Sequence, residues 1–75
     1  MAANTYFGDK LRKWRIDSGL SQQELAKAIG ARPKSISSFE SGETEPNWSA
    51  IKKLAEALNV PLVELVKYTL RMNAT

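Results

Sequence analysis

The sequence predicts an all-α fold, a single compact domain of five short helices within residues 1–75. Apolar residues recur at helical spacing along most of the chain, and no stretch alternates apolar and polar residues as a half-buried strand does. Capping residues, glycines and prolines divide this pattern into five segments. We expect helices at about residues 5–18, 22–29, 33–40, 48–57 and 61–70.

The first helix is predicted from an apolar stripe near the start of the chain. Phe7, Leu11 and Trp14 recur at i, i+4 and i+7, which places them on one face of a helix. Gly19 ends the segment, because glycine readily adopts the left-handed conformation that follows a helix. Leu20 is then expected to pack into the core.

The second and third helices lie in SQQELAKAIGARPKSISSFESG, residues 21–42. Ser21 followed three residues later by Glu24 has capping-box spacing, and Gly30 suits the end of the helix that begins there. Pro33 fits the first position of the next helix, where its missing N–H costs nothing. Two eight-residue helices joined by a three-residue turn have the spacing of a helix-turn-helix unit, whose second helix can enter a DNA groove.

The fourth and fifth helices follow SGETEPN, whose turn-forming residues cannot continue a helix. Asn47 is a good N-cap, and Asn59 can take the left-handed conformation at the end of the fourth helix. The fifth helix is expected to begin at Pro61. The apolar residues of both helices that should face the core are Trp48, Ile51, Leu54, Ala55, Leu58, Leu62 and Leu65. For both tryptophans we expect core packing rather than stacking on DNA or a ligand.

Composition excludes several functions. The chain has no cysteine and no histidine, so disulfides, Ser–His or Cys–His nucleophiles and the usual zinc ligand sets are unavailable. No P-loop or GxGxxG motif occurs, and the eight carboxylates are scattered. We therefore expect no enzyme, no cofactor, no metal and no small-molecule ligand. A signal peptide and a membrane-spanning run are also lacking, which fits an intracellular, cytoplasmic protein.

Charge is unevenly distributed along the chain. Residues 1–39 hold seven Lys and Arg against three Asp and Glu, whereas residues 40–75 hold four against five. The positive excess lies in the half with the helix-turn-helix unit, and cationic side chains gain affinity for DNA by releasing its condensed counterions. The alternative is an ordinary solvated surface, because a net charge of +3 is small.

The pattern S-Q-x-E-L-A-x-x-I-G followed by S-I-S-x-F-E-x-G resembles the helix-turn-helix domain of phage repressors of the Cro/repressor, or XRE-like, family. The resemblance covers about residues 6–66, because FGDKLRKWRIDSGLS is similar to the family's first helix and ETEPNWSAIKKLAEALNVPLVELV to its last two. It implies a lambda-repressor-like fold and a sequence-specific regulator of transcription, most like a repressor, that binds double-stranded DNA. The alternative is a protein-interaction module of the same fold, an antitoxin or co-regulator, with weak DNA binding.

The resemblance also implies which residues contact DNA. In the family the third helix enters the major groove and the second crosses the backbone. Ile36 and Phe39 should face the core, which leaves the outer side of the third helix for DNA. The implied base-reading residues are Arg32, Pro33, Lys34, Ser37 and Ser38, with Lys34 foremost because lysine donates to guanine O6 and N7. The implied phosphate contacts are Gln22, Gln23, Lys10 and Arg12, although Lys10 and Arg12 are equally expected on a solvated face.

Two further expectations come from the resemblance. Arg15 and Glu40 match family positions that form a salt bridge beneath the surface, although Arg15 is also suited to a phosphate. The family usually binds a palindrome as a dimer, and the candidate dimer surface is Val63, Val66 and Leu70. The alternative is that Val66 and Leu70 complete the core of a monomer.

The chain departs from the family pattern in the loop after the third helix. Glu43 and Glu45 stand where many relatives carry basic or neutral residues, and both would repel DNA unless they turn away. At Arg32 a side-chain cap of the third helix is also lacking, so Pro33 must help that helix to start.

Overall fold

The structure, a computed structural model, describes the backbone of residues 6–73 and the side chains of residues 7–69. Over this range the chain forms five α-helices and no strand: α1 (Tyr6–Asp17), α2 (Gln22–Ile29), α3 (Pro33–Ser41), α4 (Trp48–Leu58) and α5 (Leu62–Asn73). The predicted all-α, five-helix fold is confirmed. Helix α5 begins one residue after Pro61 and continues past residue 70, and the expected start of the first helix at residue 5 lies outside the described residues.

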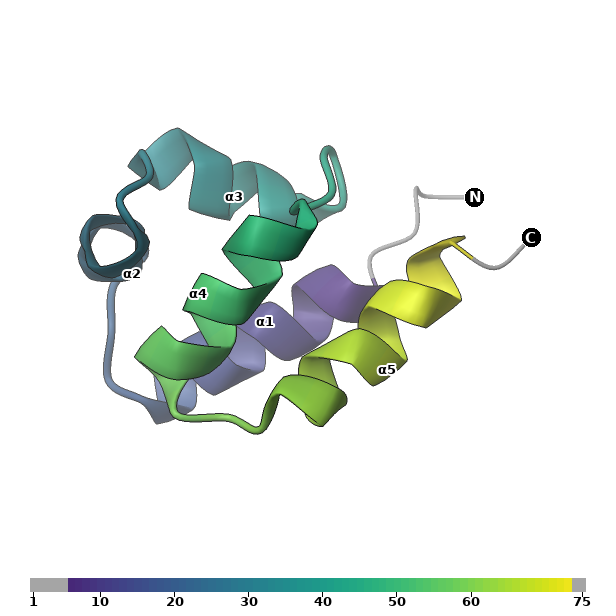
Figure 1. Ribbon diagram of the computed structural model, residues 1–75. Coiled ribbons are helices and arrows are strands. Elements are labelled where there is room, and N and C mark those ends of the chain that lie inside the picture. Colours follow the sequence, from purple (N-terminus) through teal and green to yellow (C-terminus); the bar gives the residue numbers. More distant parts are fainter. Residues whose placement is uncertain (1–5, 74–75) are drawn as a thin grey trace.

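The helices pack so that α3 has one face on the molecular surface. Helix α1 lies against α3 and α5, while α4 lies against α2 and α5. In Figure 1, α3 runs along the upper edge of the molecule and α2 is seen end-on beside it, so the two helices cross steeply. This is the arrangement of a helix-turn-helix unit. One side of α3 therefore rests on the protein and the other is open to a partner.

The predicted caps are present at the helix ends. Ser21 Oγ accepts a hydrogen bond from the Glu24 amide at 3.0 Å, and Glu24 Oε1 accepts one from the Ser21 amide at 2.8 Å. Asn47 caps α4 by accepting from the amide three residues later at 2.8 Å. Gly30 and Asn59 adopt left-handed conformations after α2 and α4, with φ of 71° and 57°. These caps satisfy amides and carbonyls that the helices leave unpaired.

One apolar core receives side chains from every helix. Helices of 8 to 12 residues are marginal when isolated, so their stability depends on this shared burial. Trp14, Leu20 and Phe39 are partly buried and pack against it. The buried apolar residues are Phe7, Leu11, Leu25, Ala26, Ile29, Ile36, Ile51, Leu54, Ala55, Leu58 and Leu65.

Two residues expected in the core lie at its edge. The side of α4 that carries Trp48 is not covered in the first turn of the helix, and Trp48 is 56% exposed, whereas Ile51, three residues later, is buried. Leu62 is the first residue of α5 and is 36% exposed. Helical spacing identifies the face of a residue but not how far along the helix that face is covered. The core predictions for Trp48 and Leu62 are therefore wrong.

Gly8 marks the closest approach of α1 and α3. A Cβ built on Gly8 would lie 2.3 Å from the carbonyl oxygen of Glu40 and 2.7 Å from that of Phe39. Both distances are below 3.0 Å, a separation that real Cβ atoms essentially never show. The lack of a side chain therefore allows the two helix backbones to touch, and this contact fixes where α3 sits relative to α1.

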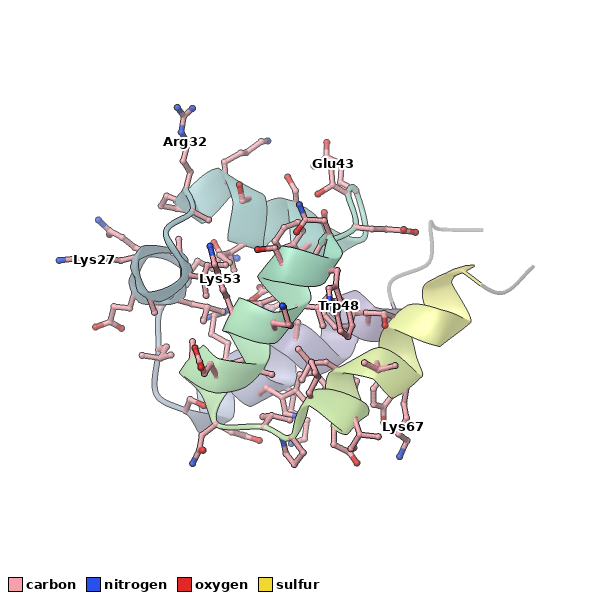
Figure 2. The ribbon with its side chains drawn as sticks, in the orientation of Figure 1. Lys27, Arg32, Glu43, Trp48, Lys53 and Lys67 are labelled. Carbon is pink, nitrogen blue, oxygen red and sulfur yellow. The ribbon has the colours of Figure 1, made fainter. Side chains whose placement is uncertain are left out.

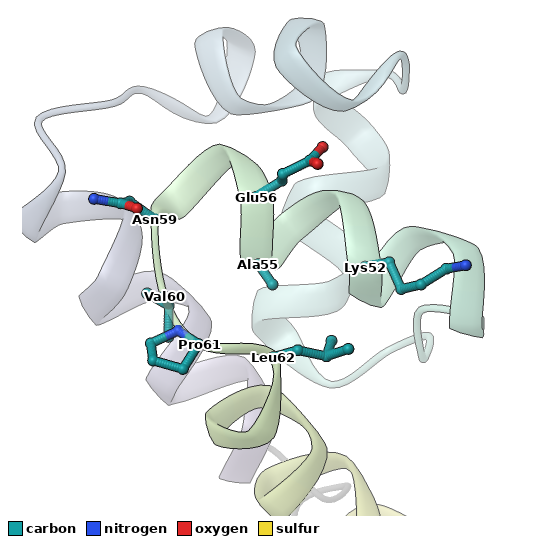
Figure 3. Close-up of a pocket in the computed structure, with 7 residues that line it drawn as sticks. All are labelled: Lys52, Ala55, Glu56, Asn59, Val60, Pro61 and Leu62. Atoms are coloured by element: carbon teal, nitrogen blue, oxygen red, sulfur yellow. The ribbon is translucent and has the colours of Figure 1, made fainter.

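A shallow hollow of about 500 Å³ lies where α4 joins α5. Figure 3 shows its walls, in which Lys52 and Glu56 extend from α4 while Pro61 and Leu62 come from the connection and the start of α5. The remaining lining residues are Ala55, Asn59 and Val60. Its lining mixes apolar side chains with Lys52, Glu56 and Asn59, and it brings no group of catalytic side chains together.

Candidate nucleic-acid interface

The outward face of α3 is polar and cationic. Lys34, Ser37 and Ser41 recur at i, i+3 and i+7, and all three are exposed. Arg32 and Pro33 are exposed at the beginning of the helix. Four of the five predicted base-reading residues thus lie together, and Ser41 extends the same face. Sequence reasoning missed Ser41, although its spacing of seven residues from Lys34 is a usable signal.

Ser38 does not share this exposure. Its side chain is 7% exposed, and its Oγ donates a hydrogen bond to Glu43 Oε1 at 3.3 Å. The chain after α3 folds back over it, because the amides of Glu43 and Thr44 donate to the Ser38 carbonyl oxygen at 2.9 and 3.3 Å. The expectation that Ser38 lies open on the outer side is therefore wrong. Helical spacing predicts on which side of the helix Ser38 lies, but it does not predict that residues after the helix fold back onto that side.

The start of α3 favours negative ligands. Arg32 occupies the N-cap position without a side-chain cap bond, and Pro33 fills the first turn as predicted. A helix N-terminus carries a partial positive charge, and Arg32 and Lys34 add two full charges. Neither residue, nor Lys27 at the end of α2, forms an ion pair with another described residue. Figure 2 shows Lys27 and Arg32 projecting outward beside the turn between α2 and α3.

The predicted phosphate contacts divide into two groups. Gln23 and Arg12 are exposed, whereas Gln22 is half-buried and its Nε2 donates to Glu40 Oε1 at 3.1 Å. Lys10 is also half-buried, with Nζ 5.5 Å from the ring centroid of Trp14 and 5.3 Å from that of Tyr68. These cation–π contacts hold the Lys10 charge between α1 and α5. Its position therefore does not support a phosphate role.

The expected ion pair between Arg15 and Glu40 is present beneath the interface. Arg15 Nε lies 2.6 Å from Glu40 Oε2, and the two side chains are only 11% and 6% exposed. Arg15 also donates to the Leu20 carbonyl oxygen at 2.8 Å. Because Gln22 donates to the same carboxylate, the pair links α1, α2 and α3. This network holds α3 in a fixed orientation relative to α1 and α2.

The candidate dimer surface is only partly described. Val63 is 61% exposed on α5, and Val66 is half-buried. The side chain of Leu70 lies outside the described residues. Leu62 adds exposed apolar area at the start of the same helix. An apolar surface of this kind on a small domain is suited to a protein contact.

The described residues also bear on metal binding and on membrane insertion. That part of the chain contains no group of three or more His, Cys, Asp or Glu side chains placed to hold a metal ion. None of its helices is both long enough and apolar enough to cross a membrane.

A steeply crossed helix pair with an exposed cationic second helix is typical of the helix-turn-helix regulators that bind DNA. Residues 11–65 match the Helix-turn-helix family model, and the chain belongs to this XRE-type helix-turn-helix family. The five helices and the family match together define the class of this chain as an XRE-type helix-turn-helix domain.

Relatives of known name support this classification. The cryptic phage CTXphi transcriptional repressor RstR from Vibrio cholerae is 35% identical over 60 residues, which cover 80% of this chain and 54% of RstR. Multiprotein-bridging factor 1 from Eremothecium gossypii is 36% identical over 55 residues, which cover 73% of this chain and 36% of that protein. The chain thus spans about half or less of these curated relatives.

A solved structure shows the same fold on DNA. The crystal structure of the P22 c2 repressor in complex with a synthetic operator is similar to this chain, with a TM-score of 0.75 and 32% identity. The match covers 79% of this chain and 89% of that repressor chain. The lambda-repressor-like fold predicted from the sequence is thereby confirmed.

Proposed function

We propose that this domain recognises a specific palindromic operator as a dimer, with α3 in the major groove, and represses transcription by occupying it. The observation that carries this proposal is the exposed face of α3, which combines Arg32 and Lys34 with the hydroxyl of Ser37. Helix α3 has nine residues, so it is about 13 Å long at 1.5 Å per residue. An α-helix with its side chains is about 10–12 Å across, so a major groove about 12 Å wide accommodates one.

The side chains of α3 are suited to different base edges. Lys34 donates to guanine O6 and N7, and Arg32 is able to bind a guanine with two hydrogen bonds or to hold a phosphate. Ser37 donates or accepts, so it discriminates less between bases. Pro33 has no donor and offers only apolar contact, for which a thymine methyl group is the complementary partner. Lys34 is therefore the residue on which sequence preference depends most.

Phosphate contacts would position this face without reading sequence. Gln23 and Arg12 are exposed and available, and Gln22 retains one N–H after its hydrogen bond to Glu40. The N-terminal amides of α2 favour an anion nearby. Lys27 adds a cation that faces solvent beside the turn.

A dimer is proposed because one domain of this size reaches few base pairs. Two copies related by a two-fold axis would read half-sites about 34 Å apart. Val63 and Val66, with Leu70, are the proposed contact on α5, and exposed Leu62 adjoins them. A two-fold contact uses the same surface on both copies, so this apolar strip would meet its own equivalent.

A second candidate function is a protein-interaction module with weak DNA binding. It is favoured by the likeness to a protein named multiprotein-bridging factor. Exposed Trp48 and Val63 also give the domain apolar surface away from α3. In this case the partner protein, and not the operator, would determine where the domain acts.

Selection from a randomised duplex pool, followed by sequencing, separates the two functions. We expect the wild type to enrich a palindromic motif, and Lys34→Ala to lose preference at one position in each half-site. Lys13→Ala is the matched control, because Lys13 lies on α1, outside the proposed base-reading and dimer residues, and pairs with Asp17 at 3.6 Å. Weak, salt-sensitive retention without any motif would instead favour the protein-interaction module.

A further inference from the structure

Glu43 is folded back onto the helix that is proposed to read DNA. Its Oε1 accepts a hydrogen bond from Ser38 Oγ at 3.3 Å. Its amide donates to the Ser38 carbonyl oxygen at 2.9 Å and to Ser41 Oγ at 3.3 Å. The reversal depends on Gly42, whose φ of 82° is strained for residues with a side chain. One residue of the loop is thus anchored to the last turns of α3 by both its backbone and its side chain.

The anchor places a carboxylate at the edge of the proposed base-reading face. On a helix, residues three and four apart are neighbours, so Ser38 lies between Lys34 and Ser41. Both neighbours are exposed members of that face. Glu43 is itself exposed and forms no ion pair with a described residue. In Figure 2, Arg32 and Glu43 stand at opposite ends of α3 along the same upper edge of the molecule.

We propose that Glu43, held by Ser38, is a further base-reading residue that selects an amino group in the major groove. This inference rests on the proposed DNA-binding function. The sequence predicts a base contact from Ser38, but the Ser38 side chain is buried and donates to Glu43. Glu43 would therefore make the base contact at this edge of α3 in place of Ser38. An ionised carboxylate accepts hydrogen bonds and donates none.

The chemistry of the base edges makes such a carboxylate selective. Cytosine N4 and adenine N6 carry amino groups that donate to it, with cytosine the usual partner of Asp and Glu. Guanine presents N7 and O6 and thymine presents O4, all acceptors, so both would oppose the carboxylate. Glu43 would therefore restrict one position of each half-site to cytosine or adenine, with a preference of about fivefold or more.

The same charge acts against DNA of any other sequence. Two unit charges about 8 Å apart in water repel enough to lower an affinity about two- to threefold, before screening by salt. Every duplex presents the same phosphates, so this cost is general, whereas the hydrogen bond to an amino group occurs only at a matching base. The repulsion weakens binding to every duplex, whereas the hydrogen bond strengthens binding only to a duplex with the matching base. Together they increase the difference in affinity between the matching sequence and all others.

The test repeats the duplex selection with Glu43→Gln, Ser38→Ala and a matched control, Glu45→Gln. Glu45 is an exposed carboxylate in the same loop, and among the described residues no hydrogen bond or ion pair joins its side chain to α3. We expect wild type and Glu45→Gln to share one position restricted to cytosine or adenine. Glu43→Gln should relax that position, because glutamine both donates and accepts, and Ser38→Ala should relax it in part.

The outcomes are distinct. A motif that is the same at every position in wild type and Glu43→Gln overturns the inference while leaving the proposed function standing. A gain in affinity for unrelated duplexes of two- to threefold, without a change in the motif, also overturns it and reduces Glu43 to a repulsive charge. Failure of the wild type to enrich any motif overturns the proposed function and this inference together.

Discussion

Arg15 and Glu40 meet at two points, with Nε 2.6 Å from Oε2 and Nη2 3.3 Å from Oε1. The geometry is that of a bidentate, charge-assisted pair. It connects the first helix to the end of α3 at a nearly buried position. Because Gln22 shares the carboxylate, one side chain of α3 is bonded to both α1 and α2, the helices against which the outward face of α3 is positioned.

Removal of this carboxylate should destabilise the domain strongly. Glu40→Ala would leave the Arg15 guanidinium largely buried without its partner, which typically costs about 3–5 kcal/mol of the free energy of unfolding. Urea or thermal unfolding measures the loss, and DNA binding should weaken with it. Glu64→Ala is the control, because its pair with Lys67 is exposed and contributes about 1 kcal/mol or less. An unchanged melting temperature for Glu40→Ala would refute the structural role of the pair.

A single methyl group at Gly8 should separate α1 from α3. Alanine favours a helix interior over glycine by about 1 kcal/mol, so propensity alone predicts a gain in stability. The added Cβ would overlap two backbone carbonyls of α3. Backbone atoms in a helix cannot relieve the overlap by a rotamer change, as a side chain could. We expect a net loss of about 1–3 kcal/mol in urea unfolding. A Gly8→Ala variant as stable as the wild type would show that the crossing is looser than described.

The two tryptophans should differ in their contribution to stability. Trp14 packs on the core and makes edge contacts with Phe7 and Tyr68 at ring-centroid distances of 6.4 and 5.8 Å. Trp14→Ala should therefore cost about 3 kcal/mol or more. Trp48 is largely exposed, so Trp48→Ala should cost about 1 kcal/mol or less. Equal losses for the two variants in calorimetric or urea unfolding would contradict the prediction that the partly buried tryptophan contributes more to stability than the exposed one.

Salt dependence should distinguish Lys10 from Arg12. A side chain that contacts phosphate reduces the slope of log K against log salt by about one when it is removed. We expect that reduction for Arg12→Gln, whose charge is exposed, and no change for Lys10→Gln, whose ammonium lies over two rings. The measurement is binding of an operator duplex over a series of salt concentrations. A reduced slope for Lys10→Gln would place that lysine at the DNA.

Local signals in the sequence were sufficient to predict where the helices begin and end. Ser21 with Glu24, Gly30, Asn47 and Asn59 each act within a few residues, so their effects can be predicted without knowledge of the rest of the chain. The positions of the elements and most of the exposed face of α3 follow from these caps and from helical spacing. The ion pair between α1 and α3 was expected only because of the family resemblance, since both residues are ordinary surface types.

The remaining features depend on contacts between segments far apart in the chain. Nothing local distinguishes Gly8 from a glycine that merely weakens a helix, because its role comes from the backbone of α3. Ser38 has the spacing of an exposed residue and is covered by Glu43 after the turn at Gly42. Trp48 continues the apolar stripe of α4 but stands beyond the part of α4 that the core covers. In each case a partner outside the helix decides the outcome.

The unequal surroundings of Trp14 and Trp48 make the domain its own fluorescent reporter. Indole emission shifts to longer wavelength in water, so the Trp14 signal should report the docking of α5 through its contact with Tyr68. Trp48 should be readily quenched by a soluble agent such as iodide. Replacement of exposed Trp48 therefore leaves Trp14 to report loss of the fold, and iodide quenching of the wild type reports occupation of the α4 surface, without an attached dye.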